Sequence, residues 1–504
     1  MKILSTAQIK EWDAYTILHE PISSLDLMER AASSAFAFFK DYLQTNFYNK
    51  DSCSIAVICG QGNNAGDGLV FAKLLQQEGR EVQVYVLKLK DKGSPDFEAN
   101  LASCIALNIP IKFLENEFDL LQIPDHSIWI DALYGSGLSN YLQGLSAMLV
   151  QTINEKNGVK IAIDIPSGLF GDIQEAIQQK DAVIFKSDIT YTFQQMKTSF
   201  LFPETGGFAG KCVVVPIGLH PAYLKAIQDS WVWLEPNLLQ HKPSSKFDFK
   251  WEKGHAIMIA GSYGKVGAAL LSSKAALRAG CGLVSAYVPK VAYTIFQTAF
   301  PEAMVETDEE LTEIRNFPDC SKYDAIGIGP GLGFHPYTVM GFGNWIKHVK
   351  TPLVIDADGL NICSELLKMH PDFSFPKNCI LTPHHKEFDR LFGKCNNSFE
   401  RLNLAIEKAR QYEIIIVLKS AHTAIVTPHG NVFFNSTGNN LLATAGSGDV
   451  LTGIVTATLA KGFEPIEAAK KAVFLHGILA DSLQAKGYKN MIASDLVEEL
   501  KWHS

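Results

Sequence analysis

The feature that most limits the fold of this chain is a series of short, almost wholly apolar runs, separated by stretches long enough to hold a helix. Runs rich in Val and Ile, without an alternating pattern, are typical of strands buried on both faces of a parallel sheet. The stretches between them leave room for crossover helices. The first series covers residues 54–59, 81–87, 127–130, 160–165, 182–185 and 212–216. The second series covers residues 255–260, 283–288, 325–328, 353–355, 379–381, 414–418 and 423–426.

The two series predict two α/β domains, each with helices on both sides of a sheet. A length of 504 residues suits two large domains. Trp231–Pro236 and the Pro/Ser/Lys stretch at 241–246 lie between the series and predict a linker. We therefore expect domains at 1–225 and 226–504. Residues 1–50 predict helices, with Ser5 as an N-cap and an apolar helical face over Met28–Phe39.

The charge and cysteine content exclude several classes of protein. With 45 basic and 53 acidic residues the net charge is −8, which argues against a general binder of nucleic acid or membrane surfaces. Nine cysteines without C-x-x-C spacing indicate reduced thiols. No run approaches the ~18 apolar residues of a membrane span. We expect a cytoplasmic homo-oligomer that acts on small molecules.

A glycine loop in the second half, Leu442–Gly453, carries the strongest motif. Small residues at 445–448 allow a tight turn, and the apolar residues after it predict the start of a helix. Free N–H groups at a helix N-terminus bind anions, so Gly446, Ser447 and Gly448 are candidates for holding a phosphoryl group. Asp449 stands where a carboxylate takes a proton from an attacking hydroxyl. A helix cap at Asp449 is the alternative.

The full loop resembles the ribokinase-like superfamily and, within it, the nucleotide-dependent dehydratases of hydrated NAD(P)H. Segments 254–262, 329–333, 356–361, 381–384 and 418–423 fit the same family in order, so the resemblance covers about 246–500. It departs at Ser420 and Lys386, where the family commonly has glycine. The resemblance implies that the hydrated substrate binds Ala268, Gly331, His384 and Asp449. It implies that the adenine nucleotide binds Lys419, Ser420, Ala421, His422, Thr423 and Gly448.

Three polar loops in the first half follow predicted strands. They are 59–70 with its glycines, 131–138, and Asp164-Ile-Pro-Ser-Gly168. Ligands of parallel sheets bind beyond the carboxyl ends of strands, so three such loops predict a site, although a single Asp is also a common helix cap. Gly60, Gly62 and Gly66 permit close approach of a phosphate. The oxygen groups of Asn64, Asp131 and Ser167 suit a hard cation.

Together these loops resemble the NAD(P)H-hydrate epimerase family over about 5–218. The resemblance implies that K⁺ binds Asn64, Asp131 and Ser167. It implies that the hydrated nucleotide binds Asn63, Asn64, Ala65, Gly66, Asp67, Gly135, Ser136, Gly137, Leu138, Ser139, Asn140, Tyr141 and Asp164. Ala65 replaces the usual glycine, and a positive φ there would cost about 1 kcal/mol.

The two resemblances imply a fold class and one repair pathway. The expected fold is α/β, with an N-terminal Rossmann-like αβα sandwich and a C-terminal ribokinase-like αβα sandwich. Asp164 would serve as acid/base in exchanging the R and S forms of NADHX and NADPHX, because C6 is a carbinolamine carbon. Asp449 would assist phosphorylation of the S-hydroxyl, with ADP as donor and Mg²⁺ neutralising charge. A vitamin-precursor or sugar kinase, with a non-catalytic nucleotide-binding N-terminal domain, is the alternative.

Overall fold

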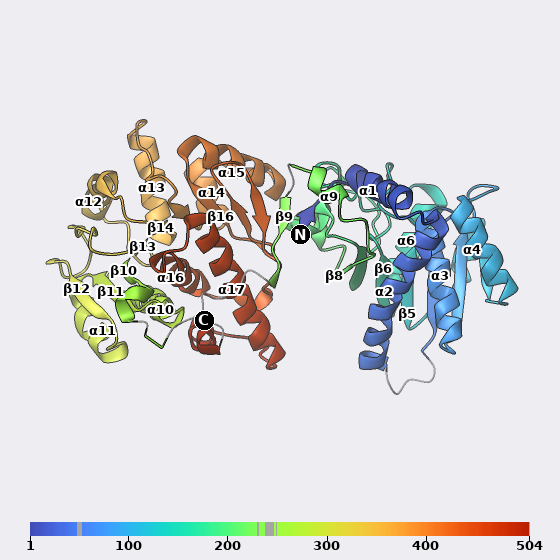
Figure 1. Ribbon diagram of the computed structural model, residues 1–504, viewed down its shortest axis with the longest axis horizontal. Helices are drawn as coiled ribbons and strands as arrows, with labels where there is room; N and C mark the ends of the chain where they lie inside the picture. The colour runs from blue at the N-terminus through green and yellow to red at the C-terminus, as the bar shows by residue number, and fades with distance from the viewer. Residues whose placement is uncertain (48–52, 229–230, 237–245, 248, 503–504) are drawn as a thin grey trace. The chain divides into compact units, whose positions relative to one another are not determined.

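The computed structural model of the chain describes residues 1–47, 53–228, 231–236, 246–247 and 249–502. The chain forms two compact units, one of residues 2–230 and one of Met1 together with 231–504 (Figure 1). Met1 joins the second unit because its ammonium donates to the Trp233 carbonyl at 2.9 Å and to the Glu235 carboxylate at 2.7 Å. Of the predicted linker at 241–246, only Lys246 is among the described residues.

The N-terminal unit is built on a seven-stranded sheet in which every pairing is parallel. The strand order is β4-β3-β2-β5-β6-β7-β8. Its strands are β2 (Ile55–Cys59), β3 (Val82–Leu87), β4 (Ile111–Leu114), β5 (Ile128–Ala132), β6 (Val159–Ile163), β7 (Ile189–Phe193) and β8 (Lys211–Val215). The chain reverses its direction across the sheet between β2 and β5, which makes a topological switch point where ligands bind.

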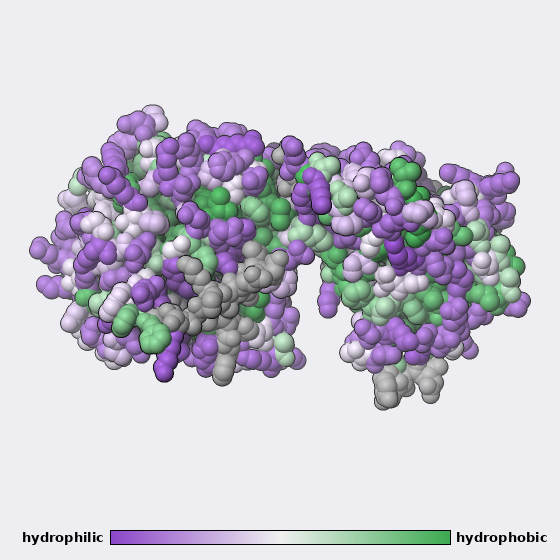
Figure 2. All heavy atoms as spheres, viewed as in Figure 1, coloured by the Kyte–Doolittle hydropathy of each residue, from purple (hydrophilic) through white to green (hydrophobic). Residues whose placement is uncertain are grey.

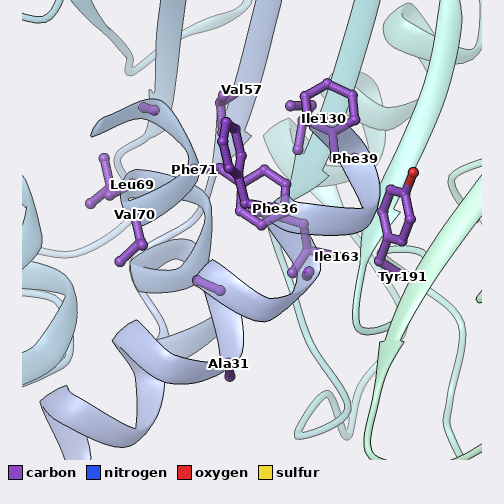
Figure 3. Close-up of a cluster of buried hydrophobic side chains, with 14 of the residues drawn as sticks. Ala31, Phe36, Phe39, Val57, Leu69, Val70, Phe71, Ile130, Ile163 and Tyr191 are labelled. Atoms are coloured by element: carbon purple, nitrogen blue, oxygen red, sulfur yellow. The ribbon is translucent and has the colours of Figure 1, made fainter. Parts of the chain in front are cut away.

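Helices cover both faces of this sheet, as the alternation along β2 shows. Val57 packs into one apolar cluster with Phe36 and Phe71, whose rings meet edge to face at 5.6 Å (Figure 3). Its neighbour Ile58 belongs to a second cluster with Trp129. The helices are α1 (Thr6–His19), α2 (Ser24–Phe47), α3 (Asn63–Gln77), α4 (Pro95–Ala106), α5 (Glu117–Leu121), α6 (Gly144–Glu155), α7 (Ile173–Ala176), α8 (Pro203–Gly206) and α9 (Tyr223–Ala226).

The second sheet has eleven strands in the order β1-β9-β18-β17-β16-β15-β14-β13-β10-β11-β12. Its strands are β1 (Lys2–Ile3), β9 (Trp231–Trp233), β10 (His255–Ile259), β11 (Leu283–Val288), β12 (Met304–Thr307), β13 (Ala325–Ile328), β14 (Leu353–Ile355), β15 (Ile380–Leu381), β16 (Ile415–Leu418), β17 (Ala424–Val426) and β18 (Val432–Phe434). The pairs from β16 through β12 are parallel, whereas β16–β17 and β17–β18 are antiparallel. The second sheet is therefore mixed, because a short turn at 419–423 reverses the chain between β16 and β17.

Helices also lie on both sides of the second sheet (Figure 1). On one side α16 packs against α10 and α17, and its apolar residues share a cluster with Ala256 and Met258 of β10. On the other side α13 packs against α12 and α14. The helices are α10 (Val266–Arg278), α11 (Tyr293–Ala299), α12 (Pro336–Trp345), α13 (Ala357–Met369), α14 (His385–Phe392), α15 (Ser398–Tyr412), α16 (Ser447–Ala460), α17 (Pro465–Ala485) and α18 (Ala493–Glu499). The expected fold class, two αβα sandwiches, is confirmed.

One predicted strand is wrong. The run 182–185 is buried but irregular. Its backbone bonds to a loop and a side chain instead of a ladder: the Phe185 N–H donates to the Ser167 carbonyl at 2.9 Å, and the Asn154 amide donates to the Ile184 carbonyl at 2.9 Å. An apolar run can thus be buried beneath a loop as well as in a sheet.

The polarity of the surface and the state of the cysteines agree with what the composition predicts. Figure 2 shows mainly hydrophilic residues over the visible face, with apolar residues gathered in separate patches. In the described part of the chain, no helix combines the length and the apolar character needed to cross a bilayer. All nine cysteines are free, and seven of them are buried.

Candidate active sites

A cavity of about 620 Å³ in the N-terminal unit opens at the carboxyl ends of β2, β5 and β6. These three strands are neighbours in the sheet, so the three polar loops predicted from the sequence meet there. The predicted residues that line the cavity are Asn63, Asn64, Asp67, Gly135, Ser136, Gly137, Leu138, Ser139, Asn140 and Asp164. Tyr141 does not line it and instead stacks on the ring of Phe170 at 5.6 Å.

Asp164 is held in an unusual conformation at the end of β6. Its φ of +65° lies in the left-handed region, which non-glycine residues rarely adopt and which is concentrated at functional sites. Its Oδ1 accepts from the Lys197 ammonium at 2.8 Å and from the Phe193 N–H at 3.3 Å. Within the described residues its Oδ2 has no hydrogen-bonding partner, so that oxygen is left for a ligand.

Lys197 is the functional residue that sequence reasoning missed in this unit. Its side chain is only 1% exposed, and a buried lysine needs a counter-ion, which Asp164 provides. The residue lies 33 positions after Asp164, beyond any local motif. A single lysine in the mostly polar stretch 194–199 gives no signal in the sequence, since most lysines are exposed.

Helix α1 contributes one face to the same cavity, which the sequence reading also missed. Thr6, Ile9, Lys10 and Asp13 line it, at the spacing of one helical face. Ser5 caps this helix as predicted, through a reciprocal box with Gln8. Burial raises the pKa of Asp13 to about 6; Lys197 opposes this shift and Asp164 adds to it. Burial also raises the pKa of Asp67 well above its usual range.

Asp131 and Ser167 form a buried pair beside the cavity. The Ser167 N–H and hydroxyl donate to the two Asp131 carboxylate oxygens at 2.7 and 2.6 Å, and the Tyr134 N–H donates to the Ser167 hydroxyl at 2.8 Å. Burial raises the pKa of Asp131 to about 6, against the effect of these hydrogen bonds. Asn64 is buried next to Gly135, and its amide nitrogen lacks a partner among the described residues. The oxygen atoms of Asn64, Asp131 and Ser167 are of the kind that a hard cation prefers, whereas the unpartnered Asn64 amide nitrogen is a donor that calls for an acceptor.

Two of the three glycines of the first loop, Gly60 and Gly66, lie where a side chain would meet neighbouring atoms. A Cβ on Gly60 would lie 2.3 Å from the Leu133 carbonyl, and one on Gly66 would lie 2.4 Å from the Met28 sulfur. Gly62, the N-cap of α3, has open space around it. Ala65 lies in the first turn of α3 and is buried in the core, so the strain considered for a positive φ does not arise.

In the C-terminal unit, the predicted loops follow β10, β13, β14, β15 and β16, which are neighbours in the sheet. Helix α16 begins at Ser447, and its N-cap Gly446 has a φ of +86°, which a side chain would disfavour. Asp449 lies in the first turn of α16. Burial raises the pKa of Asp449 to about 7, with Asp356 as the next cause and Lys419 opposing. A carboxylate of this kind suits a general base near neutral pH.

Buried Asp356 and Thr452 lie beneath this helix terminus together with half-buried Lys419. The Lys419 ammonium donates to Asp356 Oδ1 at 2.8 Å, and the Thr452 hydroxyl donates to Asp356 Oδ2 at 2.6 Å. A Cβ on Gly448 would lie 3.3 Å from the Lys419 nitrogen, so glycine keeps the ammonium close to the helix N-terminus. Asp356 belongs to the segment 356–361, for which the sequence predicted no catalytic role. Only the fold brings it to Lys419, which is 63 residues away in the chain.

The other predicted substrate residues surround the same loops. Gly331 has a φ of +61° and approaches Ala268, since a Cβ there would lie 3.2 Å from the Ala268 Cβ. His384 caps α14: its Nδ1 accepts from two backbone N–H groups, at 3.1 and 3.2 Å, so the ring hydrogen is on Nε2. Burial lowers the pKa of His384, and Lys419 adds to that shift. A neutral Nε2–H is therefore a hydrogen-bond donor at this site.

Residues 420–423 form the turn between β16 and β17. The Thr423 hydroxyl donates to the Ser420 carbonyl at 3.2 Å, and the Ser420 hydroxyl donates to the His422 carbonyl at 3.2 Å. Ser420 and Ala421 are exposed at the tip. The turn next to Lys419 is thus closed by its own side chains, and Ser420 takes the usual glycine position without a positive φ.

Comparison with known proteins supports the family resemblance predicted for each half of the chain. The family model described as NAD(P)H-hydrate dehydratase matches residues 256–501, and that described as YjeF-related protein N-terminus matches residues 24–199. The bifunctional NAD(P)H-hydrate repair enzyme of Thermofilum pendens is 31% identical over 99% of this chain and 95% of its own length. The chain belongs to the bifunctional NAD(P)H-hydrate repair enzyme family.

Other similar proteins include a further family member and a solved structure. The Escherichia coli member of the family is 31% identical over 94% of this chain and 88% of its own length. Among solved structures, the ADP/ATP-dependent NAD(P)H-hydrate dehydratase from Bacillus subtilis, co-crystallised with ATP and Mg²⁺, is 28% identical. It covers 54% of this chain and 96% of its own, with a TM-score of 0.47. The predicted family and the enzyme class, an epimerase joined to a dehydratase, are confirmed.

Proposed function

We propose that the N-terminal unit interconverts the R and S forms of NADHX and NADPHX, and that the C-terminal unit dehydrates the S form at the expense of ADP, giving NAD(P)H, AMP and phosphate. The observation that carries the proposal is that each unit places a buried or half-buried carboxylate beside the carboxyl ends of parallel strands. Asp164 lies at one site and Asp449 at the other.

In the N-terminal unit, Asp164 acts as acid/base at C6. Protonation of the C6 hydroxyl lets it leave as water while the ring nitrogen supplies the electron pair. Return of water to the opposite face, with loss of a proton, gives the other epimer. Lys197 orients the Asp164 carboxylate, and Asn63, Asn64, Asp67 and the loop 135–140 surround the nucleotide. Ala65, Gly66 and Tyr141 act through the shape of their segments, since they do not line the cavity.

In the C-terminal unit, Asp449 takes the proton of the S-hydroxyl as its oxygen attacks the terminal phosphorus of the nucleotide. The amides of Ser447 and Gly448 and the Lys419 ammonium stabilise the phosphoryl group. Phosphate then leaves C6 with the C–O electron pair, the ring nitrogen forms the C=N bond, and loss of the C5 proton restores the dihydropyridine. Ala268, Gly331 and the Nε2–H of His384 position the ring, and residues 420–423 hold the adenine nucleotide.

The residues expected to bind K⁺ offer oxygen ligands that suit this ion. In the C-terminal unit, by contrast, the described protein side chains do not form a complete set of ligands for Mg²⁺. Asn64, Asp131 and Ser167 would hold K⁺ and so steady the loop 131–135 through charge. In the C-terminal unit, the Asp356 carboxylate is occupied by Lys419 and Thr452. Over the described ranges, no group of three or more His, Cys, Asp or Glu residues is arranged to hold a metal ion. Mg²⁺ would therefore be held chiefly by the nucleotide phosphates, as Mg²⁺ often is.

The test is to incubate the purified chain with mixed epimers and excess ADP or ATP and to follow the absorbance of NADH. We expect both epimers to be converted. Asp164→Ala should consume the S form at the parental rate and then slow to the spontaneous epimerisation rate. The unchanged first phase is the internal control, because general destabilisation would slow both phases. A parent protein with the same two phases would refute the epimerase assignment, and a variant with one fast phase would refute the role of Asp164.

A small-molecule kinase in the C-terminal half is the alternative. The glycine loop would serve it equally well. The same assay separates the two functions, because a kinase leaves a stable phosphorylated product whereas the dehydratase releases inorganic phosphate together with NADH. Accumulation of a phosphorylated substrate without NADH would favour the kinase.

A further inference from the structure

Asp13 has the features of a second acid/base in the N-terminal cavity. It lies on the face of α1 that lines the cavity, together with Thr6, Ile9 and Lys10. It is half-buried, and within the described residues its carboxylate forms no hydrogen bond or ion pair. A carboxylate withdrawn from water without a partner is costly, so its retention indicates a ligand or a proton-transfer role.

Asp13 interacts electrostatically with Asp164 and with the lysine that pairs with Asp164. Lys197 forms the ion pair with Asp164 and also acts on Asp13, while the two carboxylates repel each other. The charged and titratable groups that face Asp13 are Lys197, Asp164, Asp67 and, on its own helix, Lys10. Two carboxyl groups therefore enter one cavity from different elements, Asp13 from α1 and Asp164 from the end of β6.

Epimerisation at C6 needs proton transfer on both faces of the ring. The hydroxyl leaves one face as water and returns to the other, and a carboxyl group on one side of the ring does not reach the other side. We propose that Asp13 and Asp164 serve opposite faces of the hydrated ring, each giving a proton to the departing oxygen on its own face and taking one from the water that returns there. This inference rests on the proposed epimerase function.

The proton and electron balance closes. On one face, a carboxyl group protonates the hydroxyl, the C6–O bond breaks, and the ring nitrogen forms the C=N⁺ bond. On the other face, water adds to C6, the C=N⁺ electrons return to nitrogen, and the second carboxylate takes the proton. The proton returns to the first group through solvent. Asp67 also lines the cavity, but it is more deeply buried than Asp13, and this burial raises its pKa well above its usual range, so it is less suited to cycling between its two forms.

The experiment uses the full chain without nucleotide, in water labelled with ¹⁸O. It follows both interconversion of the epimers and uptake of label at C6, with the spontaneous rates subtracted. In the parent we expect both epimers to interconvert and to take up label. Asp13→Asn should slow interconversion by about 10²–10⁴-fold, as loss of an acid/base group does, while one epimer still exchanges its oxygen. Asp164→Ala should preserve exchange in the other epimer.

The control variants separate this role from a structural one. Glu11→Gln changes an exposed carboxylate on the same helix, bonded to the Tyr223 hydroxyl, and should match the parent. Asp13→Glu should restore part of the interconversion rate. Three outcomes would overturn the assignment. Asp13→Asn would interconvert the epimers within threefold of the parental rate, or it would lose oxygen exchange in both epimers. Alternatively, the variant that exchanges oxygen in one epimer only would be Asp67→Asn. A parent that does not interconvert the epimers would refute the epimerase function itself.

Discussion

Residue scale: Asp164 and Asp449 are the same residue type in two different electrostatic surroundings. Asp164 is bound to a buried ammonium, with Lys197 at 2.8 Å. Burial raises the pKa of Asp449 first of all; Asp356, Asp358 and Glu387 add to that shift and Lys419 opposes it. The fold thus gives the two carboxyl groups different surroundings, a buried ammonium at Asp164 and a group of carboxylates at Asp449.

Asp449→Asn should abolish dehydration and leave the fold and nucleotide binding largely intact. The substitution keeps the size of the side chain but removes the proton acceptor, and loss of a general base costs about 10²–10⁴-fold in rate. The measurement is the turnover of the S epimer with ADP, together with nucleotide affinity by titration calorimetry. Turnover within tenfold of the parent would show that Asp449 is only a helix cap.

Dehydration should depend on pH through Asp449. Because burial raises its pKa to about 7, the carboxyl group is mostly protonated and inactive as a base below that pH. The kcat/KM for the S epimer should therefore rise about tenfold per pH unit below pH 7 and level off above it. The profile is measured with the spontaneous acid-catalysed reaction subtracted. A rate that is flat from about pH 6 to pH 8 would contradict this assignment of the base.

Element scale: the contact of α3 with the strands beneath it explains one glycine of the first loop. A Cβ on Gly68 would lie 2.5 Å from the Ala132 Cβ and 3.2 Å from a Val57 methyl group. Both neighbours are fixed in central strands, so neither can move away. Gly66, by contrast, meets the flexible end of Met28. Gly68 in this loop is therefore explained by the close packing of α3 on the sheet, and not by the binding site.

Gly68→Ala should destabilise the N-terminal unit by about 1–3 kcal/mol, the usual cost of overpacking a core. The gain in helix propensity, about 1 kcal/mol, is too small to offset the clash. The matched control in the same unit is Gly207→Ala, where the Cβ meets nothing within 4 Å and the φ of −61° suits any residue. Urea unfolding monitored by circular dichroism measures both variants. Equal stability of the two would contradict the close contact.

Whole-molecule scale: apart from the edge strand β1 (Lys2–Ile3), each unit carries its own sheet and its own site, so each should fold alone. The boundary at 230/231 matters, because β9 (Trp231–Trp233) pairs with β18 in the second sheet. We expect fragments 2–230 and 231–504 each to unfold cooperatively. The first should interconvert epimers without nucleotide, and the second should consume only the S form with ADP. A C-terminal fragment that begins at 235 lacks β9 and should be less stable.

Calorimetry of each fragment and of the full chain checks this prediction. A fragment without a cooperative transition would show that the boundary is misplaced or that the unit depends on the rest of the chain. Equal stability of the fragments that begin at 231 and 235 would show that β9 adds little to the second sheet.

By itself the sequence determined the α/β class, most strands and the main polar loops, because buried parallel strands leave apolar runs and because loops after such strands carry ligands. The strands it missed include β7, Ile189-Thr-Tyr-Thr-Phe193, whose threonines interrupt the apolar pattern, β4, an edge strand that includes Lys112, and the short strands β9, β12 and β18. Only the tertiary structure joined Lys197 to Asp164 and Lys419 to Asp356. Such pairs form between residues that are distant in the chain, so no local sequence pattern predicts them.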